Sequence, residues 1–425
     1  MKDFSIIFKE VLKSIKPSEE EIQKINTLLE NFLNKFKENL KGLHINAEIF
    51  IGGSFAKNTL IKKDQYDVDV FLRFDKKYNE TEISKLTAEA LGESADVSVI
   101  HGSRDYFRIK LEPFIYVELI PVKKIKNPQE AENTTDLSHL HVSYVNKKIN
   151  SEKILDEIRI AKAFCHANKV YGAESYIGGF SGYSIELLVI YYKSFLKFIK
   201  AISKVKEKII IDIEKNHKNK RAVMMDLNSA KLQSPVILID PTFKHRNTLA
   251  ALRKETFEKF QKVCKEFLKK RDIKFFYESK INLEEAKKRA IKNKCEFLLL
   301  EAKTLKQAGD VAGSKLLKFY KHLKDEISRF YEIKDTGFIY DNSQESTFFF
   351  SVKNKKEIII PGPKIEDKSN VSKFKKKHKK TIIKNQKIFA KEKVEDKLRH
   401  FIAKWVIKNK EKINEMYVNE LNIIN

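Results

Sequence analysis

Apolar residues recur at helical spacing near the start of the chain. They stand three and four positions apart at Ile22, Ile25, Leu28, Leu29, Phe32 and Phe36. This spacing predicts a helix with one apolar face. Ser18 and Glu21 have the spacing of a capping box that would begin the helix, and Gly42 would end it. The amphipathic segment before Pro17 predicts a separate first helix.

The segments that follow alternate apolar and polar residues, which predicts strands. The expected strands are 45–51, 67–72, 106–111 and 115–122. Helices are expected over 55–61 and 85–91, because the apolar period changes there. Together these elements predict an α+β N-terminal unit with a small mixed sheet.

The middle of the chain is predominantly helical. Helices are expected from 152 to 205, with a loop over 171–182, followed by a strand over 236–239 and a helix over 255–268. In the last third, strands are expected over 297–300, 347–352 and 357–360, and helices over 313–330, 371–377 and 394–408. Pro361-Gly362-Pro363 is expected to separate two elements.

Composition narrows the class of protein. A chain of 425 residues predicts about two to four domains, and 42% hydrophobic residues suffice for packed cores. The net charge, 84 − 58 = +26, favours a polyanionic partner, either nucleic acid or an anionic membrane surface. Cys165, Cys264 and Cys295 form neither a disulfide framework nor a zinc motif, which predicts a reducing cytoplasm. The longest apolar run, 185–192, is too short to span a bilayer, so no membrane is expected as a partner.

Two carboxylates, Asp67 and Asp69, alternate along an expected strand and therefore share one of its faces. Neighbouring anions repel each other, and a hard cation such as Mg²⁺ would relieve that repulsion. A solvated edge strand gives the same pattern, so the pair alone does not decide. Glu118 stands inside the apolar segment 115–120, where an unpaired charge is costly. Three carboxylates could hold two metal ions.

The residues before this pair suggest a phosphate site. Gly53 and Ser54 follow a strand and precede an expected helix, where backbone N–H groups are open to an anion. Lys57 adds a positive charge and Thr59 adds a hydroxyl. A phosphate site beside a metal-binding carboxylate pair is what phosphoryl transfer requires.

The order of these motifs resembles the DNA polymerase β-type nucleotidyltransferase superfamily. The resemblance rests on Gly-Ser-Phe-Ala-Lys-Asn-Thr-Leu from Gly53, on Asp-Val-Asp-Val-Phe from Asp67, and on the apolar strand that carries Glu118. It implies transfer of a nucleoside monophosphate from a nucleoside triphosphate to an acceptor, and it leaves the acceptor open.

Further motifs along most of the chain resemble the archaeal, class I CCA-adding enzymes, which are tRNA nucleotidyltransferases. These motifs are residues 136–141, Lys162, 171–174, 179–188, Asp240-Pro241, Arg246-Asn247, and 361–363 with Val371, Phe374, Lys377 and His378. The resemblance implies an α+β fold with three parts. A polymerase β-like nucleotidyltransferase head would span 1–143, and a helical central domain that binds the nucleotide and the primer end would span 144–255. An α+β body and tail that binds tRNA would span 256–425.

The resemblance also implies a set of site residues. The catalytic, metal-binding carboxylates would be Asp67, Asp69 and Glu118. The nucleotide-binding residues would be Ser54 and Lys57 on the phosphates, His141, Lys162 and Tyr171 on the triphosphate or ribose, and Arg246 on the incoming base. Glu118 stands where the family usually has Asp, and Lys57 stands where Arg is also common.

Structural interpretations of the same residues stay open. Without the resemblance, Lys162 would be an ordinary lysine on a basic helix, and Tyr171 would only pack within its loop. His141 fits a structural turn as well as a ligand contact. A zinc pair of His139 and His141 is not favoured, because no Cys or further His completes it.

The densest positive run, residues 373–380, has three interpretations. It is a solvated lysine face, a membrane-surface helix, or an RNA contact. A wide apolar face is missing, and the run lies beyond the catalytic unit, which favours a grip on the RNA backbone.

The function expected from these observations is template-independent addition of C, C and A to tRNA 3′ ends. CTP and ATP would be the substrates, two Mg²⁺ ions the cofactors, and tRNA the partner, with a homodimer left open. One alternative is another polymerase β-like transferase, such as a poly(A) polymerase or an oligoadenylate synthetase. A second alternative is a non-catalytic RNA-binding protein.

Overall fold

A computed structural model describes residues 3–93, 96–102, 104–278, 281–394 and 396–424. The chain divides into two compact units, Met1–Ser279 and Lys280–Asn425. Helices and strands occur in both units, so the predicted α+β class is confirmed. The finer division into head, central domain and body stays a prediction.

The first unit begins with a mixed five-stranded sheet in the order β1-β2-β5-β4-β3. Its strands are β1 (Ala47–Ile51), β2 (Tyr66–Phe74), β3 (Val97–Ile100), β4 (Tyr106–Glu112) and β5 (Ile115–Lys123). Strands β2 and β5 are parallel, and the other neighbours are antiparallel. The four strands predicted in this region are therefore present, and β3 is an additional edge strand.

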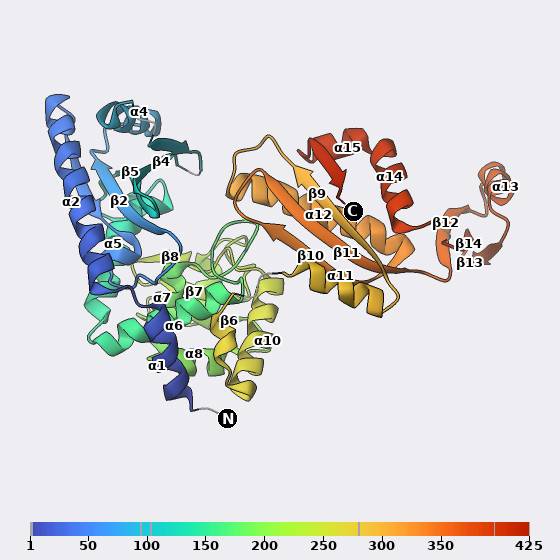
Figure 1. The fold of residues 1–425 in the computed structure, drawn as a ribbon, viewed down its shortest axis with the longest axis horizontal. Coiled ribbons are helices and arrows are strands. Elements are labelled where there is room, and N and C mark those ends of the chain that lie inside the picture. The colour runs from blue at the N-terminus through green and yellow to red at the C-terminus, as the bar shows by residue number, and fades with distance from the viewer. Residues whose placement is uncertain (1–2, 94–95, 103, 279–280, 395, 425) are drawn as a thin grey trace. The chain divides into compact units, whose positions relative to one another are not determined.

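Helices cover one face of this sheet (Figure 1). They are α2 (Glu19–Gly42) and α4 (Glu80–Leu91), and α1 (Phe4–Ile15) precedes them in the chain. The predicted capping box is confirmed, because Ser18 accepts from the Glu21 N–H and the Glu21 carboxylate accepts from the Ser18 N–H. The short helix expected over 55–61 is instead the single turn α3 (Gly53–Ala56), which ends before the positive-φ residue Asn58.

The rest of the first unit is mainly helical. Its longer helices are α5 (Ser138–Lys148), α6 (Glu152–Ala167), α7 (Gly182–Tyr192), α8 (Phe195–Ile202), α9 (Lys220–Asp226) and α10 (Lys254–Lys270). Short 3₁₀ turns are Pro128–Glu130, Thr134–Leu137 and Ile273–Phe276. A small sheet of β6 (Ile209–Ile211), β7 (Val236–Asp240) and β8 (Phe243–Asn247) lies beside them.

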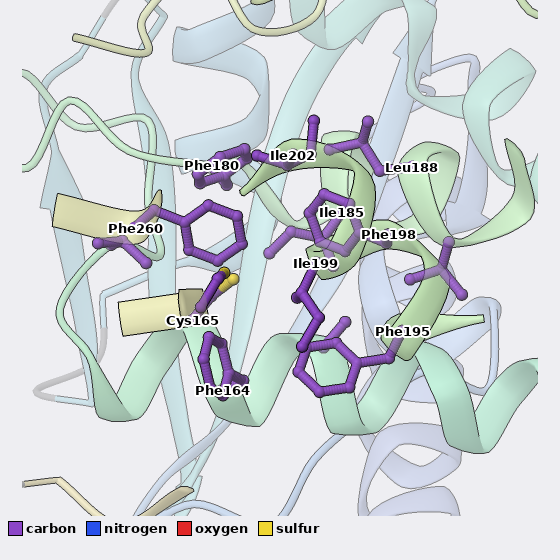
Figure 2. Close-up of a cluster of buried hydrophobic side chains, with 14 of the residues drawn as sticks. Phe164, Cys165, Phe180, Ile185, Leu188, Phe195, Phe198, Ile199, Ile202 and Phe260 are labelled. Atoms are coloured by element: carbon purple, nitrogen blue, oxygen red, sulfur yellow. The ribbon is translucent and has the colours of Figure 1, made fainter. Parts of the chain in front are cut away.

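An aromatic core fixes these helices together (Figure 2). Phe164 of α6, Phe198 of α8 and Phe260 of α10 are fully buried, and the Phe260 ring centre lies 6.1 Å from that of Phe164 and 5.7 Å from that of Phe198. Phe180 approaches Phe260 at 4.7 Å between ring centres. Helix α10 is therefore part of the first unit, whose contacts continue to Ser279.

The second unit has an antiparallel sheet in the order β10-β11-β9-β15. Its strands are β9 (Glu296–Lys303), β10 (Tyr331–Tyr340), β11 (Glu345–Asn354) and β15 (Glu420–Ile423). Its helices are α11 (Leu283–Lys292), α12 (Asp310–Phe330), α14 (Leu398–Lys408) and α15 (Lys410–Glu415). Phe319 of α12 and Trp405 of α14 pack against sheet residues such as Phe348, which forms this unit's core.

A second sheet in this unit corrects one prediction. It has the order β12-β14-β13, with β12 (Ile358–Lys364), β13 (Thr381–Lys384), β14 (Lys387–Glu392) and the nearby α13 (Lys368–Lys377). Pro361-Gly362-Pro363 lies inside β12 and does not separate two elements. Proline is tolerated there because β12 is an edge strand and its pairing is irregular between Pro361 and Lys364. No helix in the described ranges combines the length and apolarity that a bilayer crossing needs.

The aromatic core predicts a large effect of truncation. Ile199 on α8 is fully buried in this core. Ile199→Ala should lower the free energy of unfolding of the first unit by about 2–5 kcal/mol, because a cavity replaces the lost methyl groups. Ile6→Ala is the matched control: Ile6 is 57% exposed on α1, and its loss should change stability by about 0.5 kcal/mol or less. Urea unfolding followed by far-UV circular dichroism measures the free energy of unfolding of both variants. Equal losses of stability in the two variants would contradict this account of the core.

Candidate active site

Three carboxylates meet on two neighbouring strands. Asp67 and Asp69 lie on β2 and Glu118 on β5, where Asp69 and Glu118 are directly paired in the parallel register. All three line one pocket of about 170 Å³. The alternation of side chains along β2 and the pairing of β2 with β5 therefore bring the three predicted carboxylates together.

The turn before this pocket requires glycine. Gly53 has φ +61°, and a Cβ there would lie 1.6 Å from Oδ2 of Asp69. The preceding Gly52 N–H donates to the Asp69 carbonyl at 2.8 Å, which ties the turn to β2. Only a residue without a side chain can hold the backbone this close to the carboxylate.

Crowding raises the proton affinity of two carboxylates. Burial in the pocket is the main cause that raises the pKa of Glu118 to about 8, and the charges of Asp69 and Asp67 add to it. The pKa of Asp69 is raised to about 6 by burial and by Asp67, although the Lys57 charge opposes this. Negative charge is therefore costly here unless a cation accompanies it.

Two basic residues that were not among the predicted site residues provide part of the positive charge that these carboxylates require. Arg108 on β4 donates from Nη2 to Oδ1 of Asp67 at 3.0 Å, and its guanidinium lies 3.9 Å from the ring centre of Tyr116. Lys63 lines the pocket with its Nζ 5.5 Å from the ring centre of Tyr171. Partial burial lowers the pKa of Lys63, and the charge of Asp67 opposes that shift.

Two predicted nucleotide-binding lysines meet at a buried glutamate. Lys57 and Lys162 donate from Nζ to Oε2 and Oε1 of Glu186 at 2.6 and 2.7 Å, and Thr59 Oγ1 donates to Oε1 at 2.7 Å. Glu186 is fully buried on α7, and Lys162 on α6 is 2% exposed. Lys162 is therefore not an ordinary solvated lysine, which was its structural interpretation.

A second cluster surrounds the buried carboxylate of Asp240. Arg246 Nη1 lies 2.7 Å and His141 Nε2 lies 3.1 Å from Oδ2 of Asp240, and the hydroxyl of Tyr183 donates to Oδ1 at 3.1 Å. The rings of His141 and Tyr183 stack at 4.1 Å between centres. Burial lowers the pKa of His141, while the hydrogen bond with Asp240 opposes that shift.

The predicted site residues therefore fall into two groups. Those that line the pocket are Ser54, Asp67, Asp69, Glu118, Lys162 and Tyr171. Lys57, His141 and Arg246 do not line it, and Lys57 approaches the second group through Tyr183, with its Nζ 5.7 Å from the ring centre. Tyr171 is supported from behind by His166, whose ring centre lies 3.7 Å away.

The donor set suits a hard cation, because it consists of carboxylate oxygens. One oxygen of Asp67 is engaged by Arg108. Within the described part of the chain, no three His, Cys, Asp or Glu side chains are gathered closely enough to form a complete ligand set. Asp67 could bind a metal ion through its other oxygen, Oδ2, while Oδ1 accepts from Arg108.

Two family models match the first unit in succession. The model described as "Nucleotidyltransferase domain" matches residues 29–154, and the model described as "tRNA nucleotidyltransferase, second domain" matches residues 156–277. The first covers the sheet with its three carboxylates, and the second covers the helical part with Lys162, Glu186 and Arg246.

Curated relatives carry one name. A "CCA-adding enzyme" of Nanoarchaeum equitans is 38% identical over 251 residues, which are 59% of this chain and 62% of that protein. A "CCA-adding enzyme" of Methanocaldococcus jannaschii is 29% identical over 399 residues, which are 90% of this chain and 86% of that protein. The chain thus spans less than two thirds of the Nanoarchaeum protein and most of the Methanocaldococcus protein.

Solved structures agree on the fold. A crystal structure of the Cid1 poly(U) polymerase bound to MgATP matches 65% of this chain and 99% of its own, with a TM-score of 0.51 and 14% identity. This likeness shows a nucleotidyltransferase fold and nothing finer. The paired family models and the Methanocaldococcus relative are more specific, and they make this chain similar to the archaeal CCA-adding enzymes.

Proposed function

We propose that this protein adds C, C and A to the 3′ end of tRNA without a template, using CTP and ATP and releasing pyrophosphate. The observation that carries the proposal is the succession of the two family matches over residues 29–277, beside a relative named CCA-adding enzyme that aligns with 90% of the chain. No feature of the described residues favours a poly(A) polymerase, an oligoadenylate synthetase or a non-catalytic RNA-binding protein.

The carboxylate pocket would hold the reacting groups. Asp67, Asp69 and Glu118 would bind two Mg²⁺ ions, and crowding of their charges supports this role. Bound there, the ions would supply the positive charge that favours ionisation of the tRNA 3′-hydroxyl and stabilises the leaving pyrophosphate. Ser54 at the Gly53 turn would orient the triphosphate from the same pocket.

The remaining nucleotide contacts would come from the other groups. Lys57 and Lys162 would neutralise phosphate charge, and Tyr171 would support the ribose. Arg246 would offer its remaining N–H donors to the base, and His141 would approach the triphosphate or ribose. Both residues are held by Asp240, which supports a fixed orientation for each.

The second unit would hold the rest of the tRNA. Helix α13 carries exposed lysines over Lys375–Lys377, and the sheet beside it adds Lys384 and Lys387. Such a surface would grip the phosphate backbone without base readout. The domains 1–143, 144–255 and 256–425, a cytoplasmic location and a homodimer belong to this proposal as well.

The function has a direct test. A tRNA that lacks its CCA end, incubated with labelled CTP and ATP, should gain two C residues and then one A, and growth should stop there. Denaturing gels with sequencing of the product measure this outcome. Addition of A alone, or tailing without a stop, would assign the protein to another nucleotidyltransferase activity.

The metal role predicts that charge at Asp69 is indispensable. Asp69→Asn keeps the shape of the side chain and should reduce nucleotide incorporation by about 10³-fold, because several kcal/mol of transition-state stabilisation are lost. Binding of tRNA, measured by filter retention, should be unchanged. Asp64→Asn is the control, since Asp64 is an exposed aspartate that does not line the pocket. Incorporation by Asp69→Asn near that of Asp64→Asn would refute the assignment.

The turn geometry predicts that Gly53 cannot carry a side chain. Gly53→Ala should lower incorporation by at least about tenfold, because a strained φ and a clash with Asp69 cost about 1–2 kcal/mol or move the carboxylate. Gly42→Ala is the matched control, as nothing lies within 4 Å of a Cβ at that position. Initial rates and thermal melting separate a local effect from unfolding. Wild-type rates in Gly53→Ala would show that the turn has no part in catalysis.

A further inference from the structure

Glu186 is surrounded by donors from two parts of the first unit. Lys57 and Thr59 come from the segment between α3 and β2, whereas Lys162 comes from α6 and Glu186 itself from α7. The glutamate is 0% exposed and does not line the carboxylate pocket. Each of its carboxylate oxygens accepts a short hydrogen bond from a lysine, so Glu186 cannot contact a nucleotide directly.

The donors themselves reach the pocket. Lys162 and Thr59 both line it, and Lys162 Nζ also donates to the Thr59 carbonyl at 3.2 Å and to Thr59 Oγ1 at 2.8 Å. The Thr59 N–H donates to the Ser54 carbonyl at 2.9 Å. Through Thr59, the carboxylate of Glu186 is therefore connected to the turn that carries Ser54.

The cluster holds two potential cations and one anion in a dry environment. Burial alone would raise the pKa of Glu186, but the charges of Lys162 and Lys57 outweigh it and lower the pKa to about 2. Burial lowers the pKa of Lys162 to about 8, and the charge and hydrogen bond of Glu186 oppose that shift. Removing the glutamate charge would leave two buried ammonium groups facing each other.

We infer that Glu186 is a positioning residue of the nucleotide site: it holds Lys57 and Lys162 in place as charged donors for the nucleotide phosphates and does not contact the nucleotide itself. This inference rests on the proposed function, because it assumes that the two lysines meet a triphosphate. Glu186 would thus act on the nucleotide only through the side chains of Lys57 and Lys162.

A purely structural glutamate would affect stability alone, whereas a positioning glutamate also sets the pH range in which Lys162 is charged. The protonated amine binds phosphate, so affinity is lost as the pH rises through the pKa of Lys162. The ionisable groups that surround this amine are Glu186, Lys57, Lys63, Asp69 and His166. Of the two carboxylates in this set, Glu186 accepts a hydrogen bond from Lys162 Nζ at 2.7 Å, whereas Asp69 acts on it through charge.

The test is the binding of CTP with Mg²⁺, measured calorimetrically without tRNA between about pH 6 and pH 9. In Glu186→Gln, the alkaline loss of affinity should begin about one pH unit lower than in the wild type, so that Kd near pH 8 rises about fivefold. Glu186→Asp keeps the charge but lengthens both lysine contacts, so its profile should shift in the same direction by a smaller amount.

Glu157→Gln provides the matched control. Glu157 is a half-buried carboxylate on α6 that accepts from the Phe195 N–H, whereas Lys57 and Lys162 both donate to Glu186. Its profile should coincide with that of the wild type. A profile for Glu186→Gln that coincides as well would overturn the inference, and if that variant does not fold, an unshifted Glu186→Asp decides in the same sense. Failure of the wild type to bind CTP at any pH would instead refute the proposed function, and this inference with it.

Discussion

The cost of gathering negative charge on β2 and β5 is the constraint on which the site depends. Asp69 and Glu118 are direct partners in a parallel register, and Asp67 lies on the same face two residues away. Strand pairing leaves these groups no freedom to separate, so burial and the neighbouring negative charges raise the pKa of Asp69 and of Glu118. A pocket built in this way is poised to take up cations, and the chain meets part of that demand itself through Arg108 and Lys63.

The lysine cluster at Glu186 has the opposite arrangement of charge. There one anion holds two cations within the protein interior, and the charges of Lys57 and Lys162 oppose the rise in the pKa of Asp69. Lys162 of this cluster lines the same pocket as the three carboxylates. In the proposed function, the carboxylates would face metal ions and the lysines would face phosphates. A nucleoside triphosphate with its bound cations carries both signs of charge, and such a surface is complementary to it.

The sequence predicted this site well where local periodicity determines geometry. Alternation placed Asp67 and Asp69 on one face, and a charge inside an apolar strand singled out Glu118. The same argument applies to Glu186, which stands within the apolar run 185–192, although its lysine partners lie far away in the sequence and give no local signal. Arg108 gives no local signal, because its contact with Asp67 depends on which strand neighbours β5.

The errors in the fold have a similar cause. Pro361-Gly362-Pro363 predicts a break by local chemistry, yet an edge position in a sheet removes the need for the missing N–H groups. The helix expected over 55–61 shortens to one turn, because Asn58 takes a left-handed conformation and Thr59 then bonds back to Ser54. At β12 the pairing with the distant strand β14 overrides the local pattern, whereas at Asn58 a local left-handed turn ends the helix early.

The separation of the Asp240 cluster from the carboxylate pocket has a functional consequence. Arg246 gives one terminal nitrogen to Asp240, and the planar guanidinium then keeps its remaining donors in a fixed direction. The carboxylate of Asp240 also contacts His141 and Tyr183. A shift of Arg246, His141 or Tyr183 would therefore change the positions of the other two side chains. If Arg246 contacts the base as proposed, its preference would change when the RNA end moves against it, while the carboxylates proposed to carry out the chemistry stay in register on β2 and β5. In this arrangement, the residues around Asp240 would select the nucleotide, and the carboxylates on β2 and β5 would transfer it.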